Sequence, residues 1–123
     1  MSDHIILIAH GSKDSRWLEP FKKLEEELIK EVGKDKLSLC YLDFAKPNLE
    51  SIVEKAYKKK IKSFKIIPLF MAGGGHVAVD IPEQAKKILE KYPDVTLKMT
   101  PAIGEDPLIY GAIKEVIKTQ VMF

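Results

Sequence analysis

Residues 5–12 read Ile-Ile-Leu-Ile-Ala-His-Gly-Ser, and the apolar half of this segment sets the fold class. Five consecutive apolar residues without polar alternation are typical of a strand that is buried on both faces. The polar residues and the glycine that follow indicate a loop at the carboxyl end of that strand. Because strands buried on both faces belong to parallel sheets covered by helices, the chain opens with the pattern of an α/β domain.

The rest of the chain repeats this pattern, a short apolar run followed by apolar residues at helical spacing. Further strands are expected at residues 37–42, 64–70 and 95–99. The helical stripes are Trp17–Leu28, Leu49–Tyr57, Ile81–Tyr92 and Leu108–Ile117. Four βα units predict a three-layer α/β fold, with a four-stranded parallel sheet, helices on both faces and one domain over residues 1–123. We assume the strand order 2-1-3-4, since right-handed crossovers restrict the topology without fixing it.

Single residues mark the ends of these helices. Gly33 is a natural stop for the first helix, and Asn48 is a capping residue at the start of the second. Pro82 lies in the first turn of the third helix, where a missing N–H is tolerated.

The composition excludes several classes of protein. Twenty basic and eighteen acidic side chains give a formal charge of +2, and Arg16 is the only arginine, so a nucleic-acid partner is not expected. A weakly basic, lysine-rich surface is compatible with a small polycarboxylate ligand. The single cysteine, Cys40, excludes an intrachain disulfide and a cysteine-based zinc cluster, and we expect it to fill the core. No secretion signal and no apolar run of membrane-spanning length is recognisable, so we expect a cytoplasmic protein without a membrane partner.

Two histidines follow strands that are neighbours in this topology. His10 ends the first predicted strand, and His76 closes the loop after the third. In open α/β sheets, ligands bind outside the carboxyl ends of the strands at the point where the strand order reverses. We therefore expect both imidazoles in one crevice, although each could instead be a loop residue hydrogen-bonded to backbone.

An imidazole can bind a first-row divalent metal ion and can also accept a proton near neutral pH. Two histidines are fewer than the four ligands of a structural zinc site, which favours transient handling of a metal over its storage. The glycines at residues 73–75 would let backbone approach a broad, flat ligand, or they could serve a tight turn. A phosphate could use the same loop, but the chain lacks a P-loop and a GxGxxG motif.

Other polar and aromatic residues have two interpretations. Asp43 could help as a carboxylate or cap a turn, and Lys46 could meet a ligand carboxylate or solvent. We expect Trp17 to be a core residue of the first helix, early enough to line the crevice, and His4 to be a surface residue.

Taken together, four motifs resemble the short, single-lobe class II chelatases, the family of the sirohydrochlorin cobaltochelatases and nickelchelatases. The motifs are Ala-His-Gly-Ser at residues 9–12, Asp-Phe-Ala-Lys-Pro at 43–47, Pro-Leu-Phe-Met-Ala-Gly-Gly-Gly-His at 68–76 and Asp-Ile-Pro at 80–82. The resemblance extends over nearly the whole chain. Relatives often carry glutamate where Asp43 stands.

The resemblance implies ATP-independent insertion of a divalent metal into sirohydrochlorin or a related anionic tetrapyrrole. The metal is a substrate, Co²⁺ first and Ni²⁺ or Fe²⁺ as alternatives, and no permanently bound cofactor is implied. His10 matches the family's metal ligand and proton acceptor, and His76 its second metal ligand. The substrate-contacting positions are Lys46, Met71, Ala72, Gly73, Gly74, Gly75 and His76. A homodimer whose subunits imitate the two lobes of longer relatives is also implied.

Two alternatives use the same residues. A carrier of metal or tetrapyrrole would bind in the same crevice without turnover. A histidine phosphatase also has His-Gly after its first strand, but it needs an arginine where this chain has Ala9.

Overall fold

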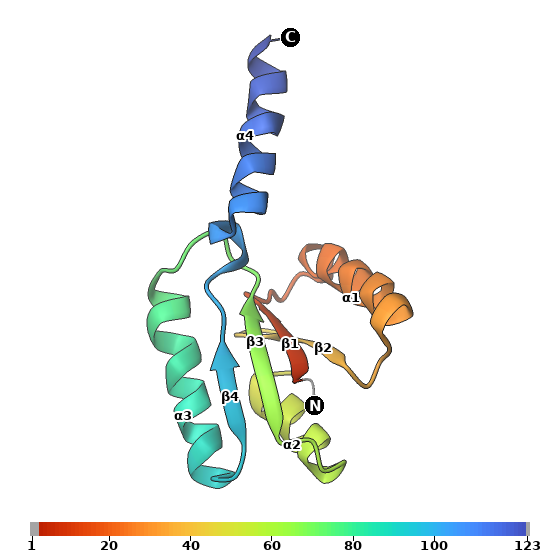
Figure 1. Cartoon of the computed structure of the whole chain (residues 1–123), viewed down its shortest axis with the longest axis vertical. Helices are drawn as coiled ribbons and strands as arrows, with labels where there is room; N and C mark the ends of the chain where they lie inside the picture. Colours follow the sequence, from red (N-terminus) through yellow and green to blue (C-terminus); the bar gives the residue numbers. More distant parts are fainter. Residues whose placement is uncertain (1–2, 123) are drawn as a thin grey trace.

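A computed structural model describes residues 3–122, with only the backbone at His76, and shows a four-stranded parallel sheet with helices around it (Figure 1). The strand order is β2-β1-β3-β4, which confirms the expected order. The strands are β1 (His4–Ala9), β2 (Leu37–Tyr41), β3 (Ser63–Pro68) and β4 (Thr96–Met99). The helices are α1 (Glu19–Val32), α2 (Leu49–Lys58), α3 (Ile81–Lys91) and α4 (Pro107–Met122). Short helical turns are η1 (Ser15–Trp17), η2 (His76–Asp80) and η3 (Ile103–Glu105).

Strand β1 is central because it pairs with a parallel strand on each side. Leu7 is in register with Leu39 of β2 and with Ile67 of β3. Ile6 and Ile8, on the other face, are fully buried and pack in one cluster with residues of α2 and α3 such as Val53 and Ile81. The unbroken apolar run of β1 is therefore explained by helices on both of its faces.

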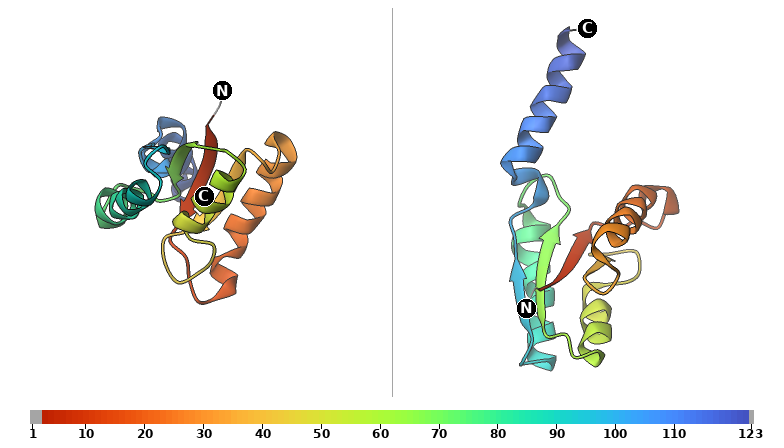
Figure 2. Two further views of the ribbon diagram at one scale, coloured as in Figure 1. Left: turned by 90° about the horizontal axis from the view of Figure 1, so that it is seen from below. Right: turned by 45° about the vertical axis from the view of Figure 1, so that its right-hand side comes forward.

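Helix α1 covers the opposite face of the sheet from α3 (Figure 2). Leu7 and Ala9 of β1 pack there against Leu18, with Phe21 and Leu28 of α1 partly buried against the same cluster. The expected helix boundaries are confirmed at Gly33, Asn48 and Pro82. Gly33 ends α1, Asn48 caps α2 by accepting a hydrogen bond from the Ser51 N–H, and Pro82 lies in the first turn of α3.

The prediction that Trp17 is a core residue of the first helix is wrong. Trp17 ends the short turn η1 before the helix begins, and its side chain is 71% exposed. Pro20 occupies the first turn of α1, a position that suits a residue without an N–H, so the helix begins at Glu19. Leu18 is buried in the position that the helical spacing of apolar residues had predicted for Trp17.

The prediction that His4 is a surface residue is also wrong. His4 is buried, with Nδ1 2.9 Å from the carbonyl oxygen of Asp35 and Nε2 2.9 Å from the Ser38 hydroxyl. Its ring also meets the ring of Phe64 edge to face, with centroids 5.9 Å apart. A buried imidazole is tolerated here because both of its nitrogens have partners.

Helix α4 differs from the other three helices because it extends beyond the carboxyl edge of the sheet, away from the remaining elements (Figure 1). Most of its residues are exposed, and the structure assigns it no buried residue. Within residues 3–122, no helix has the length and apolar character needed to cross a membrane.

Replacing Ile8 by Ala should lower the free energy of unfolding by about 2–5 kcal/mol, because it leaves a cavity beneath α2 and α3. Urea denaturation measures this loss. The matched control is Val32→Ala on α1, where the side chain is 44% exposed, and its effect should stay within about 0.5 kcal/mol. Equal losses in both variants would contradict the assignment of β1 to the core.

Candidate functional site

Backbone hydrogen bonds hold the loops after β1, β2 and β3 together at the carboxyl edge of the sheet. The Leu42 N–H donates to the carbonyl oxygen of Ala9 over 2.7 Å, and the Asp43 N–H donates to that of His10 over 3.2 Å. On the other side of β1, the Leu69 N–H donates to the carbonyl oxygen of Ile8 over 2.8 Å. The beginnings of the loops after β2 and β3 are thus fixed to the chain at residues 8–10, where β1 ends.

Gly11 makes this close approach possible. Its φ is +90°, in the left-handed region that favours glycine, and a Cβ at this position would overlap the backbone carbonyl of Asp43. The backbone conformation and the close contact with Asp43 therefore explain why glycine follows His10. It lets the chain turn directly after His10 while the β2 loop lies against it.

The His10 side chain is exposed at this edge, in contact with the loop that follows β3. Its ring lies at an angle of 60° to that of Phe70, with centroids 6.1 Å apart. A hollow of about 350 Å³ opens beside it. The hollow is lined by His10, Gly11, Ser12, Trp17, Leu18 and Phe21. Trp17 therefore lines this crevice, as predicted, although it is not a core residue.

His76 begins η2, the turn that leads into α3, and the Ala78 N–H donates to the carbonyl oxygen of Gly74 over 2.7 Å. The side chain of His76 lies outside the described part of the structure. The expected meeting of its imidazole with that of His10 therefore stays a prediction.

The glycine run at residues 73–75 is exposed, and its backbone does not require glycine. None of the three residues has φ in the left-handed region. A Cβ at Gly74 or Gly75 would meet no atom within 4 Å, and one at Gly73 would make only an ordinary contact with the Glu105 carboxylate. This geometry argues against the tight-turn alternative and leaves an exposed strip of backbone in the loop after β3.

Asp43 and Lys46 lie in the loop after β2. The Asp43 carboxylate accepts a hydrogen bond from the Phe44 N–H over 3.1 Å, so Asp43 does stabilise a turn, as one of its two interpretations held. Lys46 is exposed, and its peptide bond to Pro47 is cis. The Tyr41 N–H donates to the carbonyl oxygen of Pro47 over 2.9 Å, which closes the loop.

Sequence reasoning missed Phe44 and Lys13. Phe44 has φ of +61°, which is unusual for a residue with a bulky side chain, and its side chain is 58% exposed. The Lys13 ammonium lies 5.7 Å from the centre of the Phe44 ring, within the range of a cation–π contact. Periodicity gives no signal for either residue, because both lie in loops.

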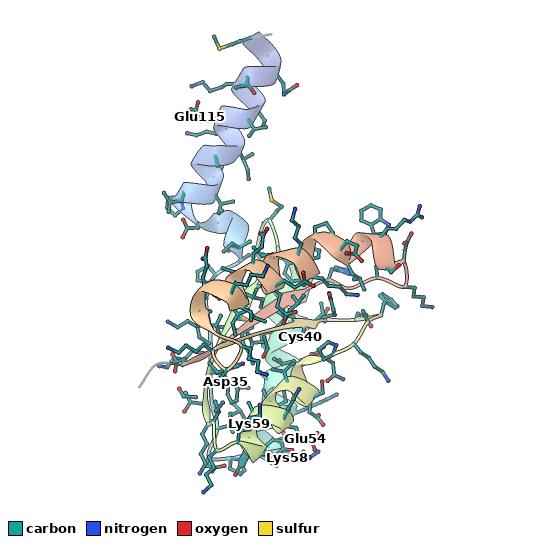
Figure 3. All side chains as sticks on the ribbon, turned by 90° about the vertical axis from the view of Figure 1, so that its right-hand side faces the viewer. Asp35, Cys40, Glu54, Lys58, Lys59 and Glu115 are labelled. Carbon is teal, nitrogen blue, oxygen red and sulfur yellow. The ribbon has the colours of Figure 1, made fainter. Side chains whose placement is uncertain are left out.

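Local interactions account for the single arginine and the single cysteine of the chain. Arg16 is paired with Asp14 at 2.7 Å, and hydrogen bonds from Arg16 lower the pKa of the Asp14 carboxyl. Burial raises the pKa of the Cys40 thiol to about 12, and Figure 3 shows this residue within the body of the domain. Cys40 therefore fills the core, as expected. Among the described side chains, which leave out His76, no three His, Cys, Asp or Glu residues are grouped closely enough to hold a metal.

A sequence profile of CbiX matches residues 4–120. The chain belongs to the CbiX family. A CbiX protein of Marinobacter aquaeolei VT8, described as one of cobalamin (vitamin B12) biosynthesis, has a solved structure similar to this CbiX chain. The TM-score is 0.85 at 33% identity, over 99% of this chain and 97% of that one.

Curated relatives of this CbiX chain differ in length and in the metal of their names. Sirohydrochlorin ferrochelatase of Priestia megaterium is 26% identical over 92% of this chain, which spans 42% of that protein. Sirohydrochlorin cobaltochelatase of Sulfurisphaera tokodaii is 27% identical over 90% of this chain and 88% of its own length. The chain thus spans less than half of the first relative and most of the second.

Replacing Gly11 by Ala should destabilise the protein by more than about 2 kcal/mol, because Ala combines an unfavourable φ with a clash against Asp43. Thermal and urea unfolding measure this change. Gly74→Ala is the matched control, since a Cβ there meets open space, and it should unfold like the parent within about 0.5 kcal/mol. The proposed structural role of Gly11 fails if both variants unfold like the parent.

Proposed function

We propose that this CbiX protein inserts a divalent metal ion into sirohydrochlorin without ATP, with Co²⁺ as the first candidate and Ni²⁺ and Fe²⁺ as alternatives. The observation that carries the proposal is an exposed imidazole, His10, held at the carboxyl edge of β1, together with the exposed glycine run at residues 73–75 in the loop after β3. The family and the names of its relatives support the substrate class.

In this proposal His10 binds the incoming metal ion and accepts the protons that the pyrrole nitrogens must lose. An imidazole suits both steps, because its neutral form is a nitrogen ligand for first-row divalent ions and a base near neutral pH. His76 acts as the second metal ligand. Two protein ligands leave coordination positions open, so the ion can pass to the macrocycle.

The ligand is flat, apolar on its faces and negatively charged at its edges, and exposed residues of the loops after β1, β2 and β3 suit such a shape. Gly73, Gly74 and Gly75 offer unobstructed backbone along one side, and Met71 and Ala72 are exposed beside them. Phe44 and Trp17 add exposed aromatic faces for stacking. Lys13 and Lys46, both exposed, attract the carboxylates, and Asp43 has a supporting role through its turn.

Choice of metal does not follow from this set of residues. Nitrogen ligands bind Ni²⁺ somewhat more tightly than Co²⁺ and both more tightly than Fe²⁺, so metal supply and site geometry would decide between them. The names of the relatives include both iron and cobalt. We also propose, as the family resemblance implies, that the active species is a homodimer whose subunits imitate the two lobes of longer relatives.

Replacing His10 by Ala should lower the rate of metal insertion about 100-fold or more, since both a ligand and a proton acceptor are lost. The visible spectrum of sirohydrochlorin, mixed separately with Co²⁺, Ni²⁺ or Fe²⁺ and compared with a protein-free mixture, measures the rate. Lys58→Ala, an exposed position at the opposite edge of the sheet, is the control and should match the parent. Insertion by His10→Ala at the parent's rate would refute its role, and binding without turnover in the parent would favour the carrier alternative.

Replacing Gly74 by Val should raise KM for sirohydrochlorin about tenfold or more, because a branched side chain would stand on the surface that the macrocycle needs. The free energy of unfolding should not change, since a Cβ at this position meets no atom. Gly111→Val in α4, where a Cβ also meets no atom, is the control. An unchanged KM in Gly74→Val would show that the substrate does not approach this loop.

A further inference from the structure

A cavity of about 360 Å³ lies along the outer edge of β2, between α1 and α2. We call it the β2-edge pocket. None of the residues that line it also lines the hollow beside His10. Asp35 and Lys59 line it from different segments of the chain, and both lie below α1 in the view of Figure 3. The pocket is therefore separate from the site proposed for metal insertion.

Strand β2 has a neighbouring strand on one side only, so half of its backbone groups face away from the sheet. The Leu42 N–H, just after β2, donates to the carbonyl oxygen of Ala9 in β1. Backbone groups alternate in direction along a strand, so those of Leu37, Leu39 and Tyr41 face away from β1. Leu37 and Leu39 line the pocket, which therefore includes part of the free edge of the sheet.

Most of this edge is closed to a further strand. The Glu25 carboxylate, on α1, accepts a hydrogen bond from the Leu39 N–H over 2.8 Å. The Tyr41 N–H donates to the carbonyl oxygen of Pro47 over 2.9 Å. A peptide that extended the sheet would have to displace both contacts. The Leu37 N–H has no hydrogen-bond partner among the described residues, and a small ligand could use this single donor.

The pocket combines apolar walls with ammonium groups. Ile29 of α1 and Ile52 of α2 are half-buried and line it from helices on opposite faces of the sheet. Lys34, Lys55 and Lys59 are exposed and also line it. The ion pairs found between described side chains involve none of these three lysines. Their charges are thus available to an anion from outside the chain.

Two carboxylates also line the pocket without neutralising it. Glu25 is engaged by the Leu39 N–H, and Asp35 is exposed. Three ammonium groups against two carboxylates leave one net positive charge among the lining residues. An anion is therefore favoured over a cation in this pocket.

We propose that the β2-edge pocket binds a small carboxylate that carries a short alkyl or aryl chain. The carboxylate accepts a hydrogen bond from the Leu37 N–H and is attracted by the lysine ammonium groups, while the chain lies between Ile29 and Ile52. The volume is near the lower end of the range for small-molecule sites, which suits a ligand of this size. Inorganic phosphate would use the charges alone and would leave the apolar walls in contact with water.

Octanoate is the probe, added to the full chain without metal and without sirohydrochlorin, so this test is independent of the proposed chelation. NMR spectra should show saturable shifts of the Leu37 amide and of the Ile29 and Ile52 methyl groups, with half-saturation below about 5 mM. Neutral 1-octanol and inorganic phosphate should each bind about five times more weakly or worse. No saturation by octanoate below about 20 mM, equal binding of either comparison compound, or shifts confined to the Gly11 loop would overturn the proposal.

The double substitution Lys55→Ala with Lys59→Ala should weaken octanoate binding about fivefold or more, because two of the three ammonium groups are lost. The matched control is Lys58→Ala with Lys87→Ala, which removes the same charge at exposed helix positions outside the pocket. It should bind octanoate like the parent, within about twofold, and circular dichroism should show both variants folded. Equal weakening in the two variants would show that net charge and not the pocket attracts the anion, and would overturn the proposal.

Discussion

The structure depends on the parallel pairing of β1 with a strand on each side. Leu7 in register with Leu39 and Ile67 fixes where β1, β2 and β3 end relative to one another. The same ladder continues into the loops, where carbonyl oxygens of residues 8–10 accept hydrogen bonds from the two neighbouring connections. Because those bonds are made by backbone, they hold the first residues of the loops in place whatever the side chains are. The position of His10 is therefore determined by the pairing of β1 with its neighbours.

Gly11 allows the loops after β1 and β2 to lie against each other at this edge of the sheet. The residue after His10 must turn at a left-handed φ while the carbonyl of Asp43 lies where a side chain would begin. The glycine run after β3 differs, since neither its dihedral angles nor its contacts with the described residues require glycine. Since the fold itself does not require glycine at residues 73–75, we attribute the missing side chains to a ligand. The proposed substrate is therefore placed against these residues.

Much of this architecture could be predicted from the sequence. The unbroken apolar run of β1 and the repeated βα pattern predicted the sheet, and capping residues such as Asn48 predicted the helix ends. Trp17 and His4 could not be predicted, because Pro20 starts α1 later than periodicity suggests and because the partners of His4 come from distant Asp35 and Ser38. Local sequence also gives no direction for α4. Its orientation depends on contacts of residues 100–104 with β3 and its loop.

The central claim is that a metal ion is handled by imidazole nitrogen at the carboxyl edge of β1. X-ray absorption spectroscopy of the Co²⁺-loaded protein tests it most directly, because imidazole ligands give a multiple-scattering pattern that carboxylates and water lack. The account predicts imidazole scattering in the parent and a clear reduction in His10→Ala and in His76→Ala. A parent spectrum with oxygen ligands alone, or one that neither substitution changes, would contradict it.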